Sequence, residues 1–398
     1  MAFIEILFWI ALAVVVYTYV GYGVVLWLMV KVKELFVKPV ERPLLTDEEL
    51  PEMTLFIAAY NEELVVDEKM ANCLNIDYPR TKLHIVWCTD GSNDRTVERL
   101  QQGWPQATVL HTPERRGKTA AINRGMEYVH TPLVAFTDAN TMLNKESLRL
   151  IAHAFLDEKV GCVAGEKRIQ TGKTADAAQG GEGLYWRYES ALKALDSRLY
   201  SAAGAAGELF AIRRELFQPM EEDTLLDDFV LSLRIVEHGY RIAYLKDAYA
   251  IETGSANLLE EEKRKVRIAA GGLQSIARLW PLFNPLRYGI FSFQYVSHRV
   301  LRWSITPLLL FALMPLNLVL IFFCEERTEL YVILWLLQAL FYLAGSLGYY
   351  LSMRHTKNKL LFVPCYFLFM NFNVLRGMVY LTKRNKNEKG TWEKAKRA

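Results

Sequence analysis

An uncharged run from Ile6 to Val30 restricts most strongly what this chain can fold into. The run is longer than the about 20 apolar residues that a helix needs to cross the hydrocarbon core of a bilayer. Glu5 precedes it and bulky aromatics such as Trp9 lie inside it, which is unlike a cleaved secretory signal. We therefore expect residues 1–30 to form an N-terminal transmembrane helix.

Three further apolar segments occupy the C-terminal third: Trp303–Cys324, Leu330–Met353 and Leu360–Leu381. Residues 299–382 are therefore expected to form transmembrane or interfacial helices. The preceding stretch 281–298 mixes aromatic residues, proline and arginine, which favours an interfacial segment at the level of the lipid headgroups. The last apolar segment carries polar residues such as Asn371 and Arg376, so three placements stay open: it crosses with these groups facing protein, lies in the interface, or re-enters.

Charged residues around these segments predict the topology. The tail 383–398 and the loop 354–359 are basic, whereas the loop 325–329 is largely acidic. The positive-inside rule places both basic pieces in the cytoplasm, which requires that the last segment does not cross fully. We expect an integral protein of the inner, cytoplasmic membrane, with its soluble part and its basic tail on the cytoplasmic side.

Residues 50–280 have the pattern of one α/β domain. Polar helical stretches separate four short apolar runs, which are Met53–Ala59, Leu83–Cys88, Thr108–Leu110 and Leu133–Phe136. Alternation of this kind predicts a mainly parallel, twisted sheet flanked by helices. Because such sheets bind ligands outside the carboxyl ends of their strands, the residues that follow each run are the first candidates for a site.

Acidic side chains follow three of these runs, at Glu62, Asp90 and Asp138. Each motif taken alone is more often an ordinary turn, but three acids at one sheet edge point to a shared ligand. Asp90 could accept hydrogen bonds from a base or a ribose. Asp138 and Asn140 offer hard oxygen ligands for Mg²⁺ or Mn²⁺, which commonly keeps substrate phosphates in its shell.

Two predicted helix starts carry charged groups that suit phosphate chemistry. Lys118 lies where a helix begins, and helix N-termini attract anions, although a solvated basic turn is an equal alternative. Asp227 and Asp228 begin another helix, where acids are also favoured simply by the helix dipole. Tyr185 and Trp186 fall at helical positions, where packing is a more common explanation than stacking on a sugar.

An ordered series of motifs resembles one protein family: AAYNEE, CTDGSNDRT, RGKTAAIN, FTDAN, GAAGELFAIRRELF and LLDDFVLSLRIVEHGYRIAY. The series is similar to the membrane-integrated family-2 glycosyltransferases, which include synthases of hyaluronan, cellulose and poly-N-acetylglucosamine. The resemblance covers residues 50–280. It implies the GT-A nucleotide-diphospho-sugar transferase fold and inverting transfer from a UDP-sugar or GDP-sugar, with Mg²⁺ or Mn²⁺, at the cytoplasmic face.

The resemblance also implies roles for individual residues. Those expected beside the nucleotide are Tyr60, Glu62, Asp90 and Lys118. Asp138 matches the first acid of the metal motif Asp-x-Asp, and Asn140 replaces the second, so the affinity for the metal should be lower. Asp228 matches the general base, which takes the proton of the acceptor hydroxyl. Gly207 and Glu208 lie in the segment that shapes the acceptor site.

One motif departs further from the family pattern. Processive members carry Gln-x-x-Arg-Trp, whose Arg binds the leaving diphosphate and whose Trp stacks on the acceptor sugar. Arg267 fits the arginine position, whereas Arg264 replaces Gln and Ile268 replaces Trp. The loss of the stacking ring favours addition of one or a few sugars. A basic stripe facing anionic lipid remains the alternative explanation for the cations before Arg267.

The predicted function is therefore that of an inverting glycosyltransferase with a UDP-sugar favoured as donor and a saccharide or lipid-linked acceptor, acting in polysaccharide or glycolipid biosynthesis. The alternative is a catalytically weak or inactive subunit that binds a nucleotide sugar within a synthase complex. A transporter ranks last because the confident spans lack acids at the midplane. The lipid bilayer is an expected partner, and no nucleic-acid signature is present.

Overall fold

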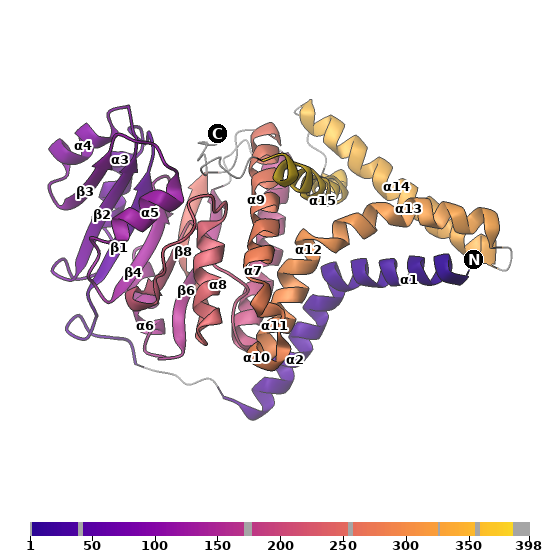
Figure 1. The fold of residues 1–398 in the computed structure, drawn as a ribbon, viewed down its shortest axis with the longest axis horizontal. Helices are drawn as coiled ribbons and strands as arrows, with labels where there is room; N and C mark the ends of the chain where they lie inside the picture. The colour runs from indigo at the N-terminus through magenta and orange to yellow at the C-terminus, as the bar shows by residue number, and fades with distance from the viewer. Residues whose placement is uncertain are drawn as a thin grey trace.

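The computed structural model describes residues 2–38, 43–170, 177–253, 258–324, 327–354 and 359–384. An α/β domain occupies one side of the molecule, and long apolar helices extend from it on the other (Figure 1). The predicted basic tail beyond residue 384, and most of the loop 354–359, lie outside the described residues.

One eight-stranded sheet forms the centre of the α/β domain. Its spatial order is β3 (Ala107–Thr112), β2 (Leu83–Asp90), β1 (Met53–Ala59), β4 (Leu133–Asp138), β7 (Phe210–Arg213), β6 (Val160–Gln170), β8 (Arg241–Thr253) and β5 (Met142–Leu143). The four predicted strands, β1 to β4, are parallel to one another, and β6 is parallel to β8. β7 is antiparallel to β4 and β6, and β5 is antiparallel to β8. The predicted α/β domain with a sheet flanked by helices is confirmed.

Helices cover both faces of the sheet (Figure 1). They are α3 (Val66–Leu74), α4 (Thr96–Gly103), α5 (Lys118–Met126), α6 (Ser147–Ala154), α7 (Ala177–Leu199) and α8 (Asp227–Glu237). The domain also contains α9 (Leu258–Arg278) and a 3₁₀ turn η2 (Arg214–Leu216). Successive residues of a strand point to opposite faces, so Phe56 packs in one core and its neighbours Leu55 and Ile57 in the other. Strand β1 is therefore buried along its whole length.

The register of the parallel strands brings the predicted acids to one edge. Ala58 is paired with both Cys88 and Asp138, and Asp90 is paired with Thr112. The carboxyl ends of β1, β2 and β4 therefore lie level with one another. The loops that follow these strands all begin at the same edge of the sheet.

Four helices in the described part of the chain are long and apolar enough to cross a membrane: Ala2–Phe36, Ile305–Phe323, Thr328–Met353 and Leu361–Lys383. The first consists of α1 (Ala2–Val16), the π-helical turn η1 (Tyr17–Gly21) and α2 (Tyr22–Phe36), and the others belong to α13 (Ile305–Phe323), α14 (Thr328–Met353) and α15 (Lys359–Lys383). The predicted N-terminal helix is thus longer than residues 1–30.

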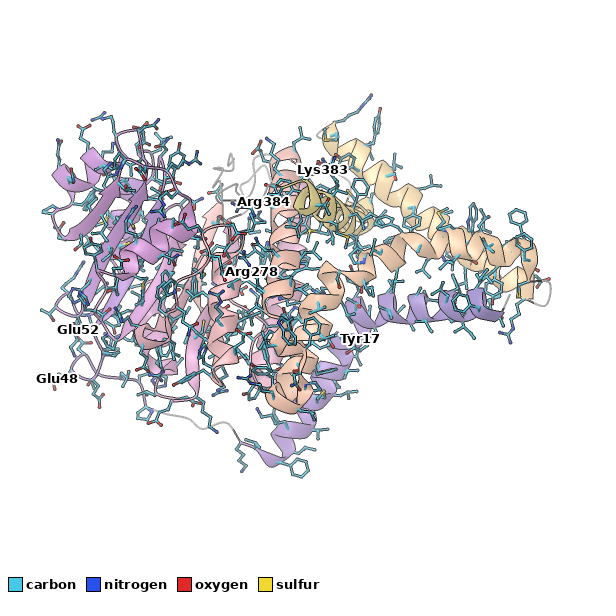
Figure 2. All side chains as sticks on the ribbon, viewed as in Figure 1. Tyr17, Glu48, Glu52, Arg278, Lys383 and Arg384 are labelled. Carbon is cyan, nitrogen blue, oxygen red and sulfur yellow. The ribbon has the colours of Figure 1, made fainter. Side chains whose placement is uncertain are left out.

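The N-terminal helix changes direction at η1 (Figure 1). Before the bend, Phe8 of α1 packs with Leu313 of α13 and Tyr331 of α14. After it, Leu26 of α2 packs against Leu192 of α7. Tyr17, labelled at the bend in Figure 2, hydrogen-bonds Ser297 with 2.8 Å between the two oxygens. The bend therefore joins the apolar bundle to the α/β domain.

The predicted interfacial stretch 281–298 is built into the core of the α/β domain. It contains η3 (Trp280–Phe283), α10 (Pro285–Tyr288), α11 (Ile290–Tyr295) and the π-helical turn η4 (Val296–Val300), which leads into α12 (Leu301–Trp303). Phe291 and Tyr295 are fully buried, whereas Trp280 and Leu286 are exposed. A position at the headgroup level remains a prediction for the exposed residues.

Helix α15 turns its polar residues toward protein. Asn371 and Asn373 are buried, and Arg376 forms an ion pair with Glu262 of α9. At Gly377 the two helices come so close that a Cβ atom would lie 2.6 Å from that of Ala269 in α9. This arrangement matches the first alternative for the polar groups, and whether the helix crosses a bilayer remains a prediction.

Candidate active site

A cavity of about 1630 Å³ lies between the carboxyl edge of the sheet and the helices α7, α9 and α15. Most of the predicted site residues line it: Glu62, Lys118, Asp138, Asn140, Gly207, Glu208, Asp228, Arg264 and Arg267. Tyr60 and Asp90 are not among its lining residues. The structure therefore gathers residues from positions 62 to 267 of the chain around one space.

Lys118 joins two acidic positions at the centre of this cavity. It is the first residue of α5, and its Nζ lies 2.8 Å from Oδ1 of Asp138 and 3.6 Å from Oδ2 of Asp227. Burial disfavours its charge, but the carboxylates of Asp138, Asp227 and Asp228 outweigh burial and raise the pKa of the Lys118 ammonium. Lys118 therefore stays protonated and is held where strand β4 ends.

The acid pair at the start of α8 faces the cavity, and the acids upstream of it do not. Asp227 and Asp228 line the cavity. Each upstream acid has an arginine partner: Glu221 pairs with Arg234, Glu222 with Arg116 and Asp223 with Arg278. Arg278 and Arg384, labelled in Figure 2, both donate hydrogen bonds to Asp223. Of the five acids between 221 and 228, Asp227 and Asp228 are therefore the candidates for a catalytic carboxylate.

Asp228 has the properties of a group that exchanges protons near neutral pH. Burial and the neighbouring carboxylate of Asp227 raise its pKa to about 7, against the opposing charge of Lys118. Its Oδ1 accepts a hydrogen bond of 2.8 Å from the backbone N–H of Phe229. A carboxylate with a pKa near the working pH is suited to general-base catalysis.

Gly207 leaves the space in front of these charged groups open. A Cβ atom at this position would lie 3.3 Å from Nζ of Lys118 and 3.5 Å from Oδ2 of Asp228. Any other residue would thus place a side chain against both groups. The cavity therefore approaches the backbone directly at this position, beside the carboxylate of Asp228.

Glu208 belongs to a buried ionic cluster on the other side of Gly207. Lys167 of β6 forms ion pairs with Glu208 and with Glu252 of β8. Burial opposes the charge of Glu208, but Lys167 outweighs it and lowers the pKa of this carboxyl to about 2. Glu208 is therefore ionised, is held in place by Lys167, and lines the cavity.

The two arginines predicted on α9 differ in their surroundings. Arg264 lies 3.6 Å from a carboxylate oxygen of Glu252 and 3.1 Å from one of Glu261, which ties α9 to the sheet. Arg267 lines the cavity and, within the described part of the chain, has no carboxylate in ion-pair range. Ile268, at the family's tryptophan position, also lines the cavity.

The residues predicted beside the nucleotide occupy the adjoining sheet edge. Asp90 is completely buried, and its two oxygens accept hydrogen bonds from the backbone N–H groups of Arg116 (2.9 Å) and Gly117 (2.7 Å). The Arg115 guanidinium stacks on the ring of Tyr60, 3.9 Å from its centre. Asp90 thus fixes the loop that presents Lys118, and its predicted contact with a base remains a prediction.

The oxygen donors present suit a cation shared with a substrate. Among the described residues, no cluster of three or more His, Cys, Asp or Glu side chains could enclose a metal ion. Asp138 and Asn140 both line the cavity where β4 ends. Mg²⁺ and similar ions are typically held by one or two carboxylates together with substrate phosphates and water. The pair therefore fits an open site of this kind and does not fit a closed structural site.

Sequence reasoning missed several charged residues of the cavity, among them Lys167, Glu189, Lys193 and Glu252. Lys167 could have been noticed because it follows the apolar run of strand β6, where a buried charge needs a partner. Its partner, Glu252, could not be identified from the sequence, because the pairing of β6 with β8 shifts in register between Gly165 and Glu166.

A family model described as "Glycosyltransferase like family 2" matches residues 51–271, which is more than half of the chain. A beta-monoglucosyldiacylglycerol synthase of Synechocystis sp. is 28% identical over 282 residues, covering 66% of this chain and 57% of the relative. A poly-beta-1,6-N-acetyl-D-glucosamine synthase of Staphylococcus aureus is 25% identical over 249 residues, covering 60% of this chain and 58% of the relative. The chain thus spans less than two thirds of the length of these curated relatives.

A solved structure shares nearly the whole architecture. The mannosyltransferase PcManGT of Pyrobaculum calidifontis, in complex with GDP-Man and Mn²⁺, superposes with a TM-score of 0.71 at 21% identity. The match covers 95% of this chain and 99% of that one, apolar helices included, which confirms the predicted GT-A fold with N- and C-terminal apolar helices. On the family model and this fold, the chain belongs to the family-2 glycosyltransferases, and four helices of its described part are long and apolar enough to span a membrane.

Proposed function

We propose that the protein is an inverting glycosyltransferase that moves a sugar from a nucleotide-diphosphate sugar to a saccharide or lipid-linked acceptor at the cytoplasmic face of the membrane. The observation that carries this proposal is the juxtaposition of Asp228, Lys118 and Asp138 in one cavity. A proton acceptor, a fixed cation and an oxygen ligand for a metal are the groups that such a transfer requires.

In the proposed reaction, Asp228 takes the proton of the acceptor hydroxyl while that oxygen attacks the anomeric carbon. The bond between the anomeric carbon and the diphosphate oxygen breaks on the opposite face, so the configuration inverts. Lys118 and Arg267 lie in the same cavity and would bind the leaving diphosphate, which carries away the electron pair. A divalent cation held by Asp138 and Asn140 would neutralise part of the diphosphate charge when bound.

The nucleotide would lie along the sheet edge at Tyr60, Glu62 and the loop that Asp90 fixes. A UDP-sugar is the favoured donor, and GDP-Man belongs in any donor panel because PcManGT is described in complex with it. Gly207 and Glu208 would lie against the acceptor. Met370 and Val374 of α15 line the same cavity, so it borders the apolar helices, as a lipid-linked acceptor requires.

The test is release of nucleoside diphosphate by the full chain in detergent, with Mn²⁺ or Mg²⁺ and a panel of UDP- and GDP-sugars. Asp228→Asn should lower release by about 100-fold or more and leave donor binding nearly unchanged. Equal release by the variant would reject Asp228 as the base. Tight donor binding without release from any donor would favour the alternative of an inactive subunit of a synthase complex.

A further inference from the structure

Lys193 is a buried cation that the proposed reaction does not use. It lies on α7, its side chain is 5% exposed, and it lines the cavity. Within the described residues its ammonium has no carboxylate within 4.0 Å and donates no side-chain hydrogen bond. A buried charge without a partner costs folding free energy, so its presence calls for a ligand or another reason.

The carboxylates around Lys193 are all engaged elsewhere. Glu189 binds Arg299 at 2.6 Å and Arg302 at 3.1 Å, and Glu208 binds Lys167. Glu166 accepts hydrogen bonds from Ser190 and from Tyr244. Burial and the nearby Arg299 lower the pKa of Lys193, against the weaker opposing effect of these carboxylates. The ammonium therefore has no carboxylate in ion-pair range among the described residues, and it lies at the cavity.

Trp186 lies at the centre of the same region. The ammonium groups of Lys167, Lys193 and Lys265 lie 5.0, 5.7 and 5.7 Å from the centre of its ring. Lys167 and Lys265 have acidic partners, in Glu208 and Glu261, and Lys193 has none. Three cations therefore surround one ring, and Lys193 is the one among them whose contact within the described residues is the ring alone, which makes the α7 side of the cavity a candidate anion site.

This site does not include Lys118, which is assigned to the donor diphosphate. Gly207 borders Lys118 and Asp228, whereas the next residue, Glu208, is paired with Lys167 in the cluster around Trp186. The base and the anion site thus lie on the two sides of residues 207–208. An acceptor whose hydroxyl reaches Asp228 could place an anionic group near Lys193.

We propose that the Lys193 site binds a phosphate group carried by the acceptor, so that the preferred acceptor is a phosphate-bearing lipid or sugar and not a neutral one. This inference rests on the proposed function. The apolar residues Met370 and Val374 line the same cavity and favour a lipid as the carrier of the phosphate. The lysine gains a charge-assisted hydrogen-bond acceptor, which offsets the cost of its burial.

The experiment measures binding to the full chain in detergent, in an Asp228→Asn background that needs no turnover. The probes are dihexanoyl phosphatidic acid, dihexanoylglycerol and glycerol 3-phosphate. Lys193→Met should weaken binding of the phosphatidic acid by about tenfold or more, leave dihexanoylglycerol unchanged, and be rescued in part by Lys193→Arg. Lys246→Met, which removes an exposed lysine of β8 outside the cavity, is the matched charge control and should change binding less than about twofold.

The outcomes separate the possible sources of the phosphate. Strong binding of the phosphatidic acid and weak binding of glycerol 3-phosphate supports a lipid acceptor, whereas equal binding supports a soluble sugar phosphate. Equal loss with dihexanoylglycerol, or no loss with either phosphate, overturns the proposal. The unfolding temperature of Lys193→Met should be unchanged or raised, since no ion pair is lost. Failure of the wild-type protein to release nucleoside diphosphate would reject the proposed function without affecting this binding result.

Discussion

The ammonium of Lys118 lies 2.8 Å from a carboxylate oxygen of Asp138, so the first residue of one helix is tied to the end of a central strand. The two groups are 20 residues apart and lie on adjacent parts of the sheet edge. A diphosphate that binds together with a cation could therefore contact both groups. Its oxygens would accept hydrogen bonds from Lys118, and its cation would be bound by the carboxylate of Asp138.

Asn140→Asp should tighten the metal site. A second carboxylate adds charge to a position that now offers a neutral oxygen, so the Mn²⁺ concentration for half-maximal activity should fall several-fold. Metal titration of nucleoside diphosphate release measures this. Asn75→Asp, at an exposed position after α3, adds the same charge away from the cavity and should leave the titration unchanged. An unchanged requirement in Asn140→Asp would exclude Asn140 as a ligand.

Asp227→Asn should shift the pH profile of the reaction. Because burial and Asp227 raise the pKa of Asp228 to about 7, the base is charged only above that pH, and activity should fall as the pH drops through 7. Removing the Asp227 charge lowers the Asp228 pKa, so the acidic limb of kcat/KM should move to lower pH. Asp247→Asn, at an exposed position in β8, serves as control. If the acidic limb of kcat/KM stays at the same pH in Asp227→Asn, the pH dependence does not come from the Asp227–Asp228 pair.

Asp228→Asn should stabilise the protein while it abolishes activity. The folded state holds the Asp228 proton more tightly than the unfolded chain, because the folded pKa is about 7 against the ordinary value of 3.8 for an aspartate. Stability from this group is therefore present at low pH and lost as the pH rises from about 4 to 7. The unfolding temperature of Asp228→Asn should exceed that of wild type at pH 8 and match it near pH 4. A lower temperature at pH 8 would contradict the raised pKa.

The sequence could predict the acids of the sheet edge because parallel strands end level. Asp138 ends β4 and Glu62 follows β1, and parallel strands bring both acids to one edge whatever the order of the strands in the sheet. The partners of Lys167 depend instead on how β6 and β8 align, with a register shift that no local pattern announces. The difference between Arg264 and Arg267 depends on the rotation of α9 against the sheet, which Glu252 fixes from a distant strand.

Asp90 shows a second limit of the sequence. Its position after a strand predicted an acid facing ligand, whereas both its oxygens accept backbone N–H groups of the loop before α5. A carboxylate that fixes a loop and one that contacts a ligand have the same local pattern, Asp-Gly-Ser. Only the fold of residues 115–117 distinguishes the two.

Lys167→Met should destabilise the protein strongly. It leaves the buried carboxylates of Glu208 and Glu252 without their shared cation, and breaking such a buried pair costs about 3–5 kcal/mol. Thermal unfolding in detergent should show a loss of several degrees. Glu208→Gln in the same background should restore part of the loss, since it removes one uncompensated charge. Independent, additive effects would contradict a shared cluster.

Gly377→Leu should uncouple α15 from the active site. A Cβ atom at position 377 would lie 2.6 Å from that of Ala269 and 3.0 Å from the carbonyl oxygen of Val266, so a larger side chain must push the two helices apart. Because α9 also carries Arg264 and Arg267, its displacement should lower kcat by about tenfold or more, with donor binding at the sheet edge retained. Val379→Leu enlarges an exposed residue of the same helix and should have little effect. Equal kcat values for the two variants would show that the contact between α15 and α9 does not position the arginines. A lower kcat in Gly377→Leu alone would show that α15 is a structural part of the catalytic cavity.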